Sequence, residues 1–282
     1  MSERHDEGGR DGPAPAAVVP SFRAVLSMAV LAALALTGCL SLLAVRVALL
    51  GNPFYTFLGM NLLLACVPLG MAAVQVILMR TLPPGPLRTA LISACALAWL
   101  LFYPNAPYLF TDFIHIAEKT WIRSNTIQWL GTRGVLWYDI VMSGAFAFVG
   151  HFLGLLSMWV EGRILDVSWG RGFERAFLAV AVILAGFGVY LGRFVRLNSW
   201  DAVLTPARAV RGTLEALADP KAVLFSLTFS FFVAVTYGML VLAFSLRDPP
   251  KIEQGSKVSL THHGVHGEHG VESKSVKTDR IP

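Results

Sequence analysis

Two short polar motifs hold most of the side chains in this chain that could do specific chemistry. The first is Pro-Asn-Ala-Pro-Tyr-Leu-Phe-Thr-Asp at 104–112, and the second is Gly-Arg-Phe-Val-Arg-Leu-Asn-Ser-Trp-Asp at 192–201. Both follow long apolar runs in a chain of 282 residues that is 55% hydrophobic and only 15% charged. Because hydrocarbon does not solvate unpaired polar groups, ionisable residues beside such runs indicate a functional site.

The first motif and the residues that follow it combine a carboxylate with an imidazole. Asp112 and His115 are three residues apart, so a helix would place them on one face, either as an oriented imidazole or as two metal ligands. Two ligands are too few to indicate a metal centre, and we expect neither a metal nor a cofactor.

The second motif contributes two guanidinium groups. Arg193 and Arg196 are also three residues apart and would form a clamp for a carboxylate or phosphate. Alternatively, they pair with Asp112, Asp139 or Asp201 and lock helix ends together, because a buried arginine needs a partner. We favour the internal network, which can also orient a binding site.

The rest of the composition excludes several classes of protein. The net charge of +5 is modest and better explained by anionic lipid and membrane orientation than by nucleic acid. No nucleotide-binding glycine loop, nucleophile elbow or His-Glu-x-x-His motif is present. Cys39, Cys66 and Cys95 all fall inside apolar runs, so no disulfide framework is expected. The Leu-Thr-Gly-Cys sequence ending at Cys39 resembles a lipoprotein processing box, but the apolar chain continues to residue 50, which favours a retained first helix.

Long apolar runs predict the elements that must position these motifs. About 20 apolar residues cross the hydrocarbon core as a helix, and we expect six such spans, at 24–45, 54–79, 89–103, 135–160, 173–191 and 222–246. The fold class is therefore all-α, a polytopic transmembrane helix bundle over residues 22–247. Residues 1–21 are expected to be a disordered polar lead, and residues 248–282 a disordered tail that contains histidines.

A break is expected in the third helix. Pro104 and Pro107 each remove a backbone donor, so we predict a broken helix at 104–107, with the following segment re-entering the membrane or lying along it. Asn105 would bond the freed backbone groups; alternatively, the motif is a Pro-Asn turn that simply ends the helix. The Gly188/Gly192 and Gly150/Gly154 pairs have the spacing of close helix contacts.

Six spans place the ends of the third and fifth and the start of the fourth at one face of the membrane. We therefore expect a polar cluster at that face, which binds a ligand or has a structural role. Its members are Asn105, Thr111, Asp112, His115, Asp139, Arg193, Arg196, Asn198 and Asp201. Basic residues near the spans are almost balanced between the two faces. If Arg193 and Arg196 belong to the site and are not counted, the face that carries the termini has more basic residues. This excess favours cytoplasmic termini.

The paired motifs resemble a family of bacterial multi-pass membrane proteins known as domain of unknown function 1361. The resemblance rests on residues 99–115, on Tyr138-Asp139 and on residues 186–201, and it extends from about residue 83 to residue 246. It implies an integral membrane protein of the bacterial cytoplasmic membrane, without a substrate or catalytic residue to transfer. Leu197 stands where the family pattern leads us to expect an aromatic residue.

The residue types favour binding over catalysis. We expect a non-enzymatic integral membrane protein whose polar cluster binds a polar ligand, a lipid headgroup or a partner protein; membrane lipids are its expected partners, together with a membrane protein, and nucleic acid is not. One alternative is an enzyme acting on a lipid-linked substrate, with Asp112 or His115 as general base and the two arginines holding phosphate. Another is a small transporter, although no inverted repeat is visible.

Overall fold

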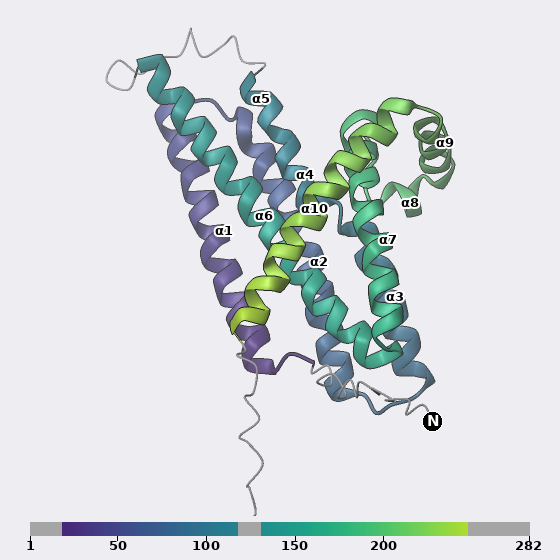
Figure 1. Cartoon of the computed structure of the whole chain (residues 1–282). Helices are drawn as coiled ribbons and strands as arrows, with labels where there is room; N and C mark the ends of the chain where they lie inside the picture. Colours follow the sequence, from purple (N-terminus) through teal and green to yellow (C-terminus); the bar gives the residue numbers. More distant parts are fainter. Residues whose placement is uncertain (1–18, 118–130, 248–282) are drawn as a thin grey trace, which may run out of the picture.

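The computed structural model describes residues 19–117 and 131–247, and these residues form helices without a strand (Figure 1). The predicted lead and tail lie largely or wholly outside the described residues. Six helical segments are long and apolar enough to cross a membrane, which confirms the predicted all-α bundle of six spans. They are Phe22–Leu50, Phe54–Thr81, Pro86–Ile116, Gly134–Trp169, Arg171–Val195 and Pro220–Leu246. The chain is thus a multi-pass integral membrane protein.

The third span differs from its prediction after the break. Helix α3 (Pro86–Phe102) stops at a turn, and the chain continues as α4 (Asn105–Tyr108), a 3-10 segment η2 (Leu109–Phe113) and α5 (Ile114–Ala117). The expectation that the span ends at residue 103 and that the rest re-enters the membrane or lies along it is therefore wrong. The prolines change the hydrogen-bonding pattern locally, but the chain keeps its course and completes the crossing (Figure 1).

The fourth span is also longer than predicted. Helix α6 runs over Gly131–Trp169. The prediction of a loop at 161–172, between the fourth and fifth spans, is therefore wrong, because most of these residues are helical. The reason is that Glu161, which looks like the end of an apolar run in the sequence, is completely buried in the bundle. The predicted span stopped before Glu161 because this residue type is charged, but the tertiary structure shields its side chain from lipid.

Helix α6 crosses the middle of the bundle (Figure 1). It packs against α1 (Phe22–Leu50), α2 (Phe57–Thr81) and α7 (Arg171–Tyr190), and α10 (Pro220–Arg247) packs mainly against α7. Large apolar side chains on the outer faces of α1 and α10 remain exposed, for example Leu34 at 66% and Phe231 at 71%. In a membrane protein this surface faces lipid, so its exposure is expected.

Four glycines hold the α4 segment between two spans. A Cβ atom added at Gly150 or Gly154 of α6, or at Gly188 of α7, would approach the segment more closely than real Cβ atoms allow, and one at Gly192 would press on it. The atoms met belong to Leu109, Ala106, Pro104 and Tyr108 respectively. The close contacts predicted from the glycine spacing therefore have one common partner, residues 104–109 of the first motif.

The connection between the fifth and sixth spans forms a small helical lobe. After the π-helical segment η4 (Leu191–Val195) come α8 (Asp201–Leu204) and α9 (Pro206–Leu217), which lie beside the upper end of α7 in Figure 1. Helix α9 buries Gly212 and Ala216, whereas Val210, Leu214 and Leu217 are 59–62% exposed. Its position between two span ends places this apolar face at the membrane interface.

Candidate functional site

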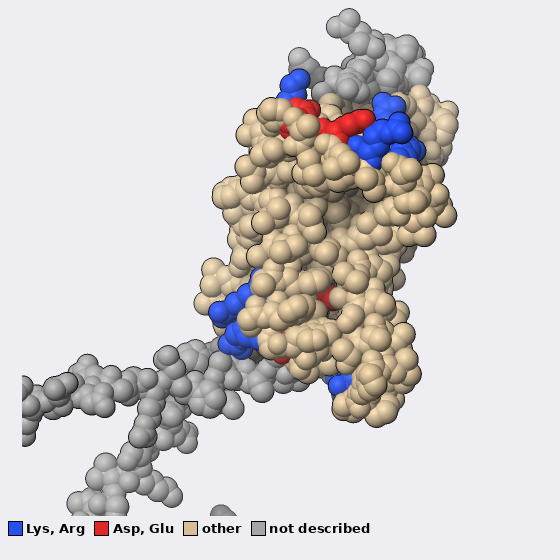
Figure 2. All heavy atoms as spheres, turned by 90° about the vertical axis from the view of Figure 1, so that its right-hand side faces the viewer, with Lys and Arg blue, Asp and Glu red and all other residues tan. Residues whose placement is uncertain are grey.

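Charged side chains gather toward the two ends of the molecule. On the face shown in Figure 2, a band without Lys, Arg, Asp or Glu separates one group of these residues at the top from another in the lower part. The predicted polar residues belong to the end that carries α5 and η4, and they divide into separate hydrogen-bonded sets instead of one network.

The first set ties α1 to α6. Arg46 donates to both carboxylate oxygens of Asp139, with Nε–Oδ1 at 2.7 Å and Nη2–Oδ2 at 3.3 Å, and neither side chain is exposed. The guanidinium also donates to the Asn52 carbonyl at 3.1 Å and lies 4.3 Å from the ring centroid of Tyr55. Among the described residues, Asp139 thus pairs with Arg46, and neither Arg193 nor Arg196 is within salt-bridge distance of it.

The second set surrounds Asp112, which is buried. Asn61 of α2 donates its amide to Asp112 Oδ2 at 2.8 Å, and Arg193 Nη1 lies 3.4 Å from Asp112 Oδ1. His115 Nε2 is 4.0 Å from the same carboxylate oxygen and 3.3 Å from Arg193 Nη2. The carboxylate therefore holds the guanidinium of η4 against the third span.

Arg196 is placed differently from Arg193. Because η4 is a π-helix and Arg196 has a left-handed backbone with φ 58°, the two arginines do not share a regular helical face as expected. Arg196 is exposed, and within the described part of the chain no carboxylate lies at salt-bridge distance from it. Its guanidinium remains available to an external anion.

Asp201 stabilises its own loop. Its carboxylate accepts hydrogen bonds from the backbone N–H of Asn198 at 2.8 Å and from the Thr205 hydroxyl at 3.3 Å. These bonds favour the charged form, so the pKa of Asp201 lies below its ordinary value, and the N–H of Asn198 is the largest cause. Asp201 is therefore a local cap and not a partner of Arg193 or Arg196.

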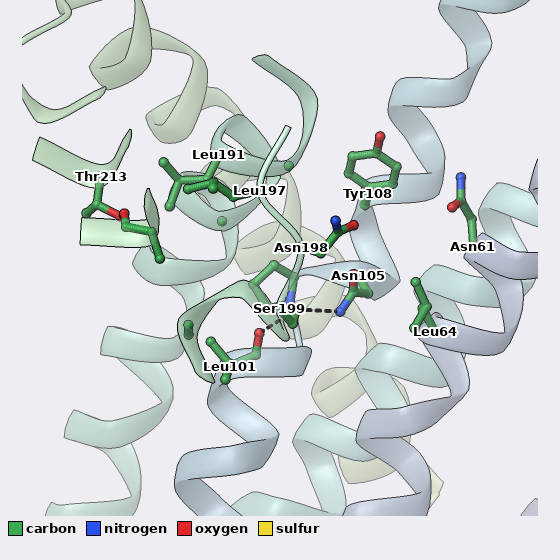
Figure 3. Close-up of a pocket in the computed structure, with 15 residues that line it drawn as sticks. Asn61, Leu64, Leu101, Asn105, Tyr108, Leu191, Leu197, Asn198, Ser199 and Thr213 are labelled. Carbon is green, nitrogen blue, oxygen red and sulfur yellow. Dashed lines mark hydrogen bonds between the residues drawn. The ribbon is translucent and has the colours of Figure 1, made fainter. Parts of the chain in front are cut away.

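The helix break is satisfied by side chains, as its loss of backbone hydrogen bonds requires. Asn105 Nδ2 donates to the Phe102 carbonyl at 2.8 Å and to Ser199 Oγ at 2.9 Å, and Ser199 Oγ donates to the Leu101 carbonyl at 3.0 Å (Figure 3). Thr111 Oγ1 donates to the Tyr108 carbonyl at 2.7 Å. Asn105 and Ser199 thus connect the two motifs directly.

Two adjoining cavities lie between the third span and the end of the fifth. One, of about 520 Å³, is lined by His115, Arg193 and Arg196, and we call it the basic cavity. The other, of about 210 Å³, is lined by Asn61, Asn105 and Ser199 together with leucines, and we call it the amide cavity (Figure 3). Both are lined by Tyr108, Gly192 and Asn198.

Sequence reasoning missed Asn61 and Tyr108. Asn61 and Gln75 are the two amide side chains in the second apolar run, and an amide in an otherwise uncharged span would have been a usable signal. Tyr108 has no such signal. No group of three His, Cys, Asp or Glu side chains suited to a metal ion occurs within residues 19–117 and 131–247.

The sequence model of a family described as "Protein of unknown function (DUF1361)" matches residues 60–236. No curated protein and no solved structure matches the chain. The matched range contains both motifs, the two cavities and the Asp112 set, whereas Arg46 lies before it.

Proposed function

Since the chain belongs to the family described as "Protein of unknown function (DUF1361)", a description that names no activity, we propose its function from the site: it binds an anionic amphiphile at the basic cavity. The observation that carries this proposal is that Arg193 and Arg196, which come from different backbone conformations, both line one cavity at the end of the membrane spans.

The charge balance of the basic cavity favours an anion. Asp112 offsets one of the two guanidiniums, since it contacts Arg193 at 3.4 Å. The second guanidinium, on Arg196, has no such carboxylate in the described residues. Guanidinium groups bind phosphate and carboxylate through two parallel N–H donors, and a phosphate or carboxylate would supply the missing negative charge.

The shape of the two cavities favours an amphiphile over a small ion. The amide cavity continues from the basic cavity past Tyr108 toward Leu101, Leu64 and the Pro104 turn. A headgroup at the arginines would have amide and hydroxyl donors next to it, followed by apolar wall. This combination of apolar lining with a few placed polar groups is typical of a ligand site.

We also propose a location for the protein, and the charge distribution of the sequence supports it. We place the protein in the bacterial cytoplasmic membrane with both termini in the cytoplasm, because removal of the site arginines from the charge count leaves the excess of basic residues on that side. The cavities then open at the outer face, where the ligand is an acidic lipid of the outer leaflet or a lipid-linked precursor. A membrane protein partner could bind at the same face.

A catalytic role is the second candidate, because His115 lines the basic cavity beside Asp112. The Nε2 atom of His115 is 3.3 Å from the Arg193 guanidinium, which contains only donors. The lone pair of His115 Nε2 is thus directed at Arg193 and not at a substrate proton. The geometry therefore supports ligand binding more strongly than catalysis by His115. Turnover of a lipid-linked substrate that is lost in His115→Gln would establish the catalytic role.

The proposal is tested by lipid titration of the purified protein in detergent, with native mass spectrometry as the readout. We expect the intact protein to prefer phosphatidylglycerol to phosphatidylcholine. Arg196→Gln should weaken binding of the anionic lipid about tenfold, because one charge-assisted contact contributes roughly 1.5 kcal/mol. Arg211→Gln is the matched control, since this exposed arginine of α9 does not line the basic cavity. Equal losses in both variants, or no preference in the intact protein, would contradict the proposal.

A further inference from the structure

A carboxyl and an amide meet inside the bundle, away from the two cavities. Gln75 Nε2 of α2 lies 2.6 Å from Glu161 Oε2 of α6, and both side chains are completely buried. Glu161 is eight residues before the end of its helix at Trp169, which corresponds to about 12 Å along the axis. The apolar residues near the pair along the two helices, Ala72, Val76, Val160 and Ile164, belong to one buried cluster together with Ile92 of α3.

No cation compensates the Glu161 carboxyl. Within the described residues, no Lys, Arg or His lies at salt-bridge distance from it. The next cations along the two helices have other contacts: Arg80 donates to the Pro20 carbonyl at 2.7 Å, and Arg163 lies over the Trp159 ring. An ionised carboxylate at this depth would be unpaired, which is strongly unfavourable in hydrocarbon.

The hydrogen bonding also fits a neutral acid better than a carboxylate. The count of unpaired atoms is the same for both forms, because one end of the Gln75 amide and Glu161 Oε1 remain buried without a partner in the described part of the protein in either case. The distance distinguishes the two forms. Exchanging the amide nitrogen and oxygen, which have nearly the same shape, lets a protonated Glu161 donate to Gln75. The separation of 2.6 Å is then an ordinary O–H···O distance, whereas it is short for N–H···O.

We propose that Glu161 is a proton-binding site at membrane depth, with Gln75 as the acceptor of the bound proton. The ligand is a proton, held in a site that shares no residue with the basic cavity, so this inference does not rest on the function proposed there. Loss of the proton would leave a carboxylate in hydrocarbon. Release therefore requires water or a cation to reach the pair between α2 and α6.

A lipid-soluble carbodiimide tests this assignment on the full-length protein in detergent. Dicyclohexylcarbodiimide reacts with a protonated carboxyl. The acid proton goes to a carbodiimide nitrogen, and the carboxyl oxygen bonds to the central carbon of the carbodiimide. The adduct then rearranges to an acylurea without a leaving group. We expect a peptide containing Glu161 to gain one reagent mass at neutral pH, and the gain to disappear in Glu161→Gln. A water-soluble carbodiimide should instead modify the half-buried Glu174. Protection by sodium would overturn the proposal, since it indicates a metal cation in place of the proton.

Infrared spectroscopy provides a second readout that needs no reagent to enter the bundle. The spectrum should contain the carbonyl band of a protonated carboxyl, and Glu161→Gln should remove it. This substitution has the shape of the neutral acid, so thermal unfolding should be nearly unchanged and a lost band cannot be attributed to misfolding. Gln75→Leu should keep the band but shift its frequency, because the acceptor is removed. If the band is absent from the intact protein, or survives in Glu161→Gln, Glu161 does not hold a proton.

Discussion

At the residue scale, Arg46 and Arg193 differ in how completely a carboxylate engages their guanidinium groups. Arg46 binds both oxygens of Asp139, and neither side chain is exposed. Arg193 reaches Asp112 through one contact at 3.4 Å, retains 18% side-chain exposure and lines a cavity. The first pair is thus a structural lock between α1 and α6, whereas the second leaves donors available for a ligand.

This difference predicts unequal effects on stability. Asp139→Ala should destabilise the protein by about 3–5 kcal/mol, because it leaves the Arg46 guanidinium buried without its carboxylate. The double substitution Arg46→Met/Asp139→Leu should recover most of that loss, since it removes both charges and refills the space. Arg193→Met is the comparison and should cost less, because Asn61 still binds Asp112. Denaturant unfolding in detergent micelles measures all three; a double variant as unstable as Asp139→Ala would contradict this account.

The loop at 198–205 should depend on pH in a defined direction. Asp201 has a lowered pKa in the folded protein, so its stabilising contribution is complete above the ordinary carboxyl pKa and is lost as the pH falls through the lowered value. Amide hydrogen exchange in this loop, corrected for intrinsic rates, should therefore rise only at acidic pH. Asp201→Asn, which keeps an acceptor for the Asn198 N–H, should remove the pH dependence. Asp201→Ala should raise exchange at every pH. If protection of this loop increased on acidification, the predicted direction of the pH dependence would be wrong.

At the scale of elements, the α4 segment is positioned by the absence of side chains on its neighbours. Gly150 and Gly154 of α6 face it from one span, and Gly188 and Gly192 face it from the other. Helices can approach this closely only where no Cβ intervenes. The amide cavity and the turn at Pro104 therefore depend on the glycines as much as on the polar residues.

A pair of glycine substitutions tests this arrangement. A Cβ atom at Gly188 would come within 2.5 Å of the Pro104 ring, whereas one at Gly238 of α10 meets nothing within 4 Å. Gly188→Ala should therefore lower stability by about 1–3 kcal/mol through overpacking against a rigid ring. Gly238→Ala is the control, and it should be neutral or slightly stabilising because alanine favours a helix. Thermal unfolding of both variants in detergent distinguishes them, and equal unfolding temperatures would exclude the close packing of Gly188 against Pro104.

At the scale of the whole molecule, the polar sets at one end follow from the alternating direction of successive spans. Six crossings bring the ends of the first, third and fifth spans to the same face, together with the starts of the second, fourth and sixth. Arg46, Asp112 and Arg193 stand near the ends of those three odd spans. Their common face is a consequence of topology, whereas their pairing is a consequence of packing.

The topology predicts which positions react from which side of the membrane. In a background with all three natural cysteines replaced, Thr205→Cys and Gly85→Cys should react with an impermeant maleimide from opposite faces of sealed vesicles. Thr205 precedes α9 on the face of the cavities, and Gly85 precedes α3 on the other. Cytoplasmic termini further predict that Thr205→Cys reacts in intact cells whose outer membrane has been permeabilised. Reaction of both positions from the same side would exclude six spans.

Residue types and their order along the chain were enough to predict the fold class and the common face of the motifs. Long uncharged runs indicate transmembrane helices because the thickness of the bilayer fixes their length. Since successive spans alternate in direction, the order of the spans then assigns each end to one face of the membrane. The need for Asn105 beside two prolines also followed from local chemistry, since a broken helix must satisfy its freed backbone groups.

The tertiary structure alone decided which polar groups meet. Asp139 pairs with Arg46 and not with either arginine of the second motif, and Asp201 caps its own loop. Spacing cannot distinguish these pairings, because several carboxylates on one face are equally available to each guanidinium in the sequence. Glu161 is the clearest case: as a residue type it ended the predicted fourth span. Its contact with Gln75, 86 positions away in the chain, is what allows it to be buried inside the bundle.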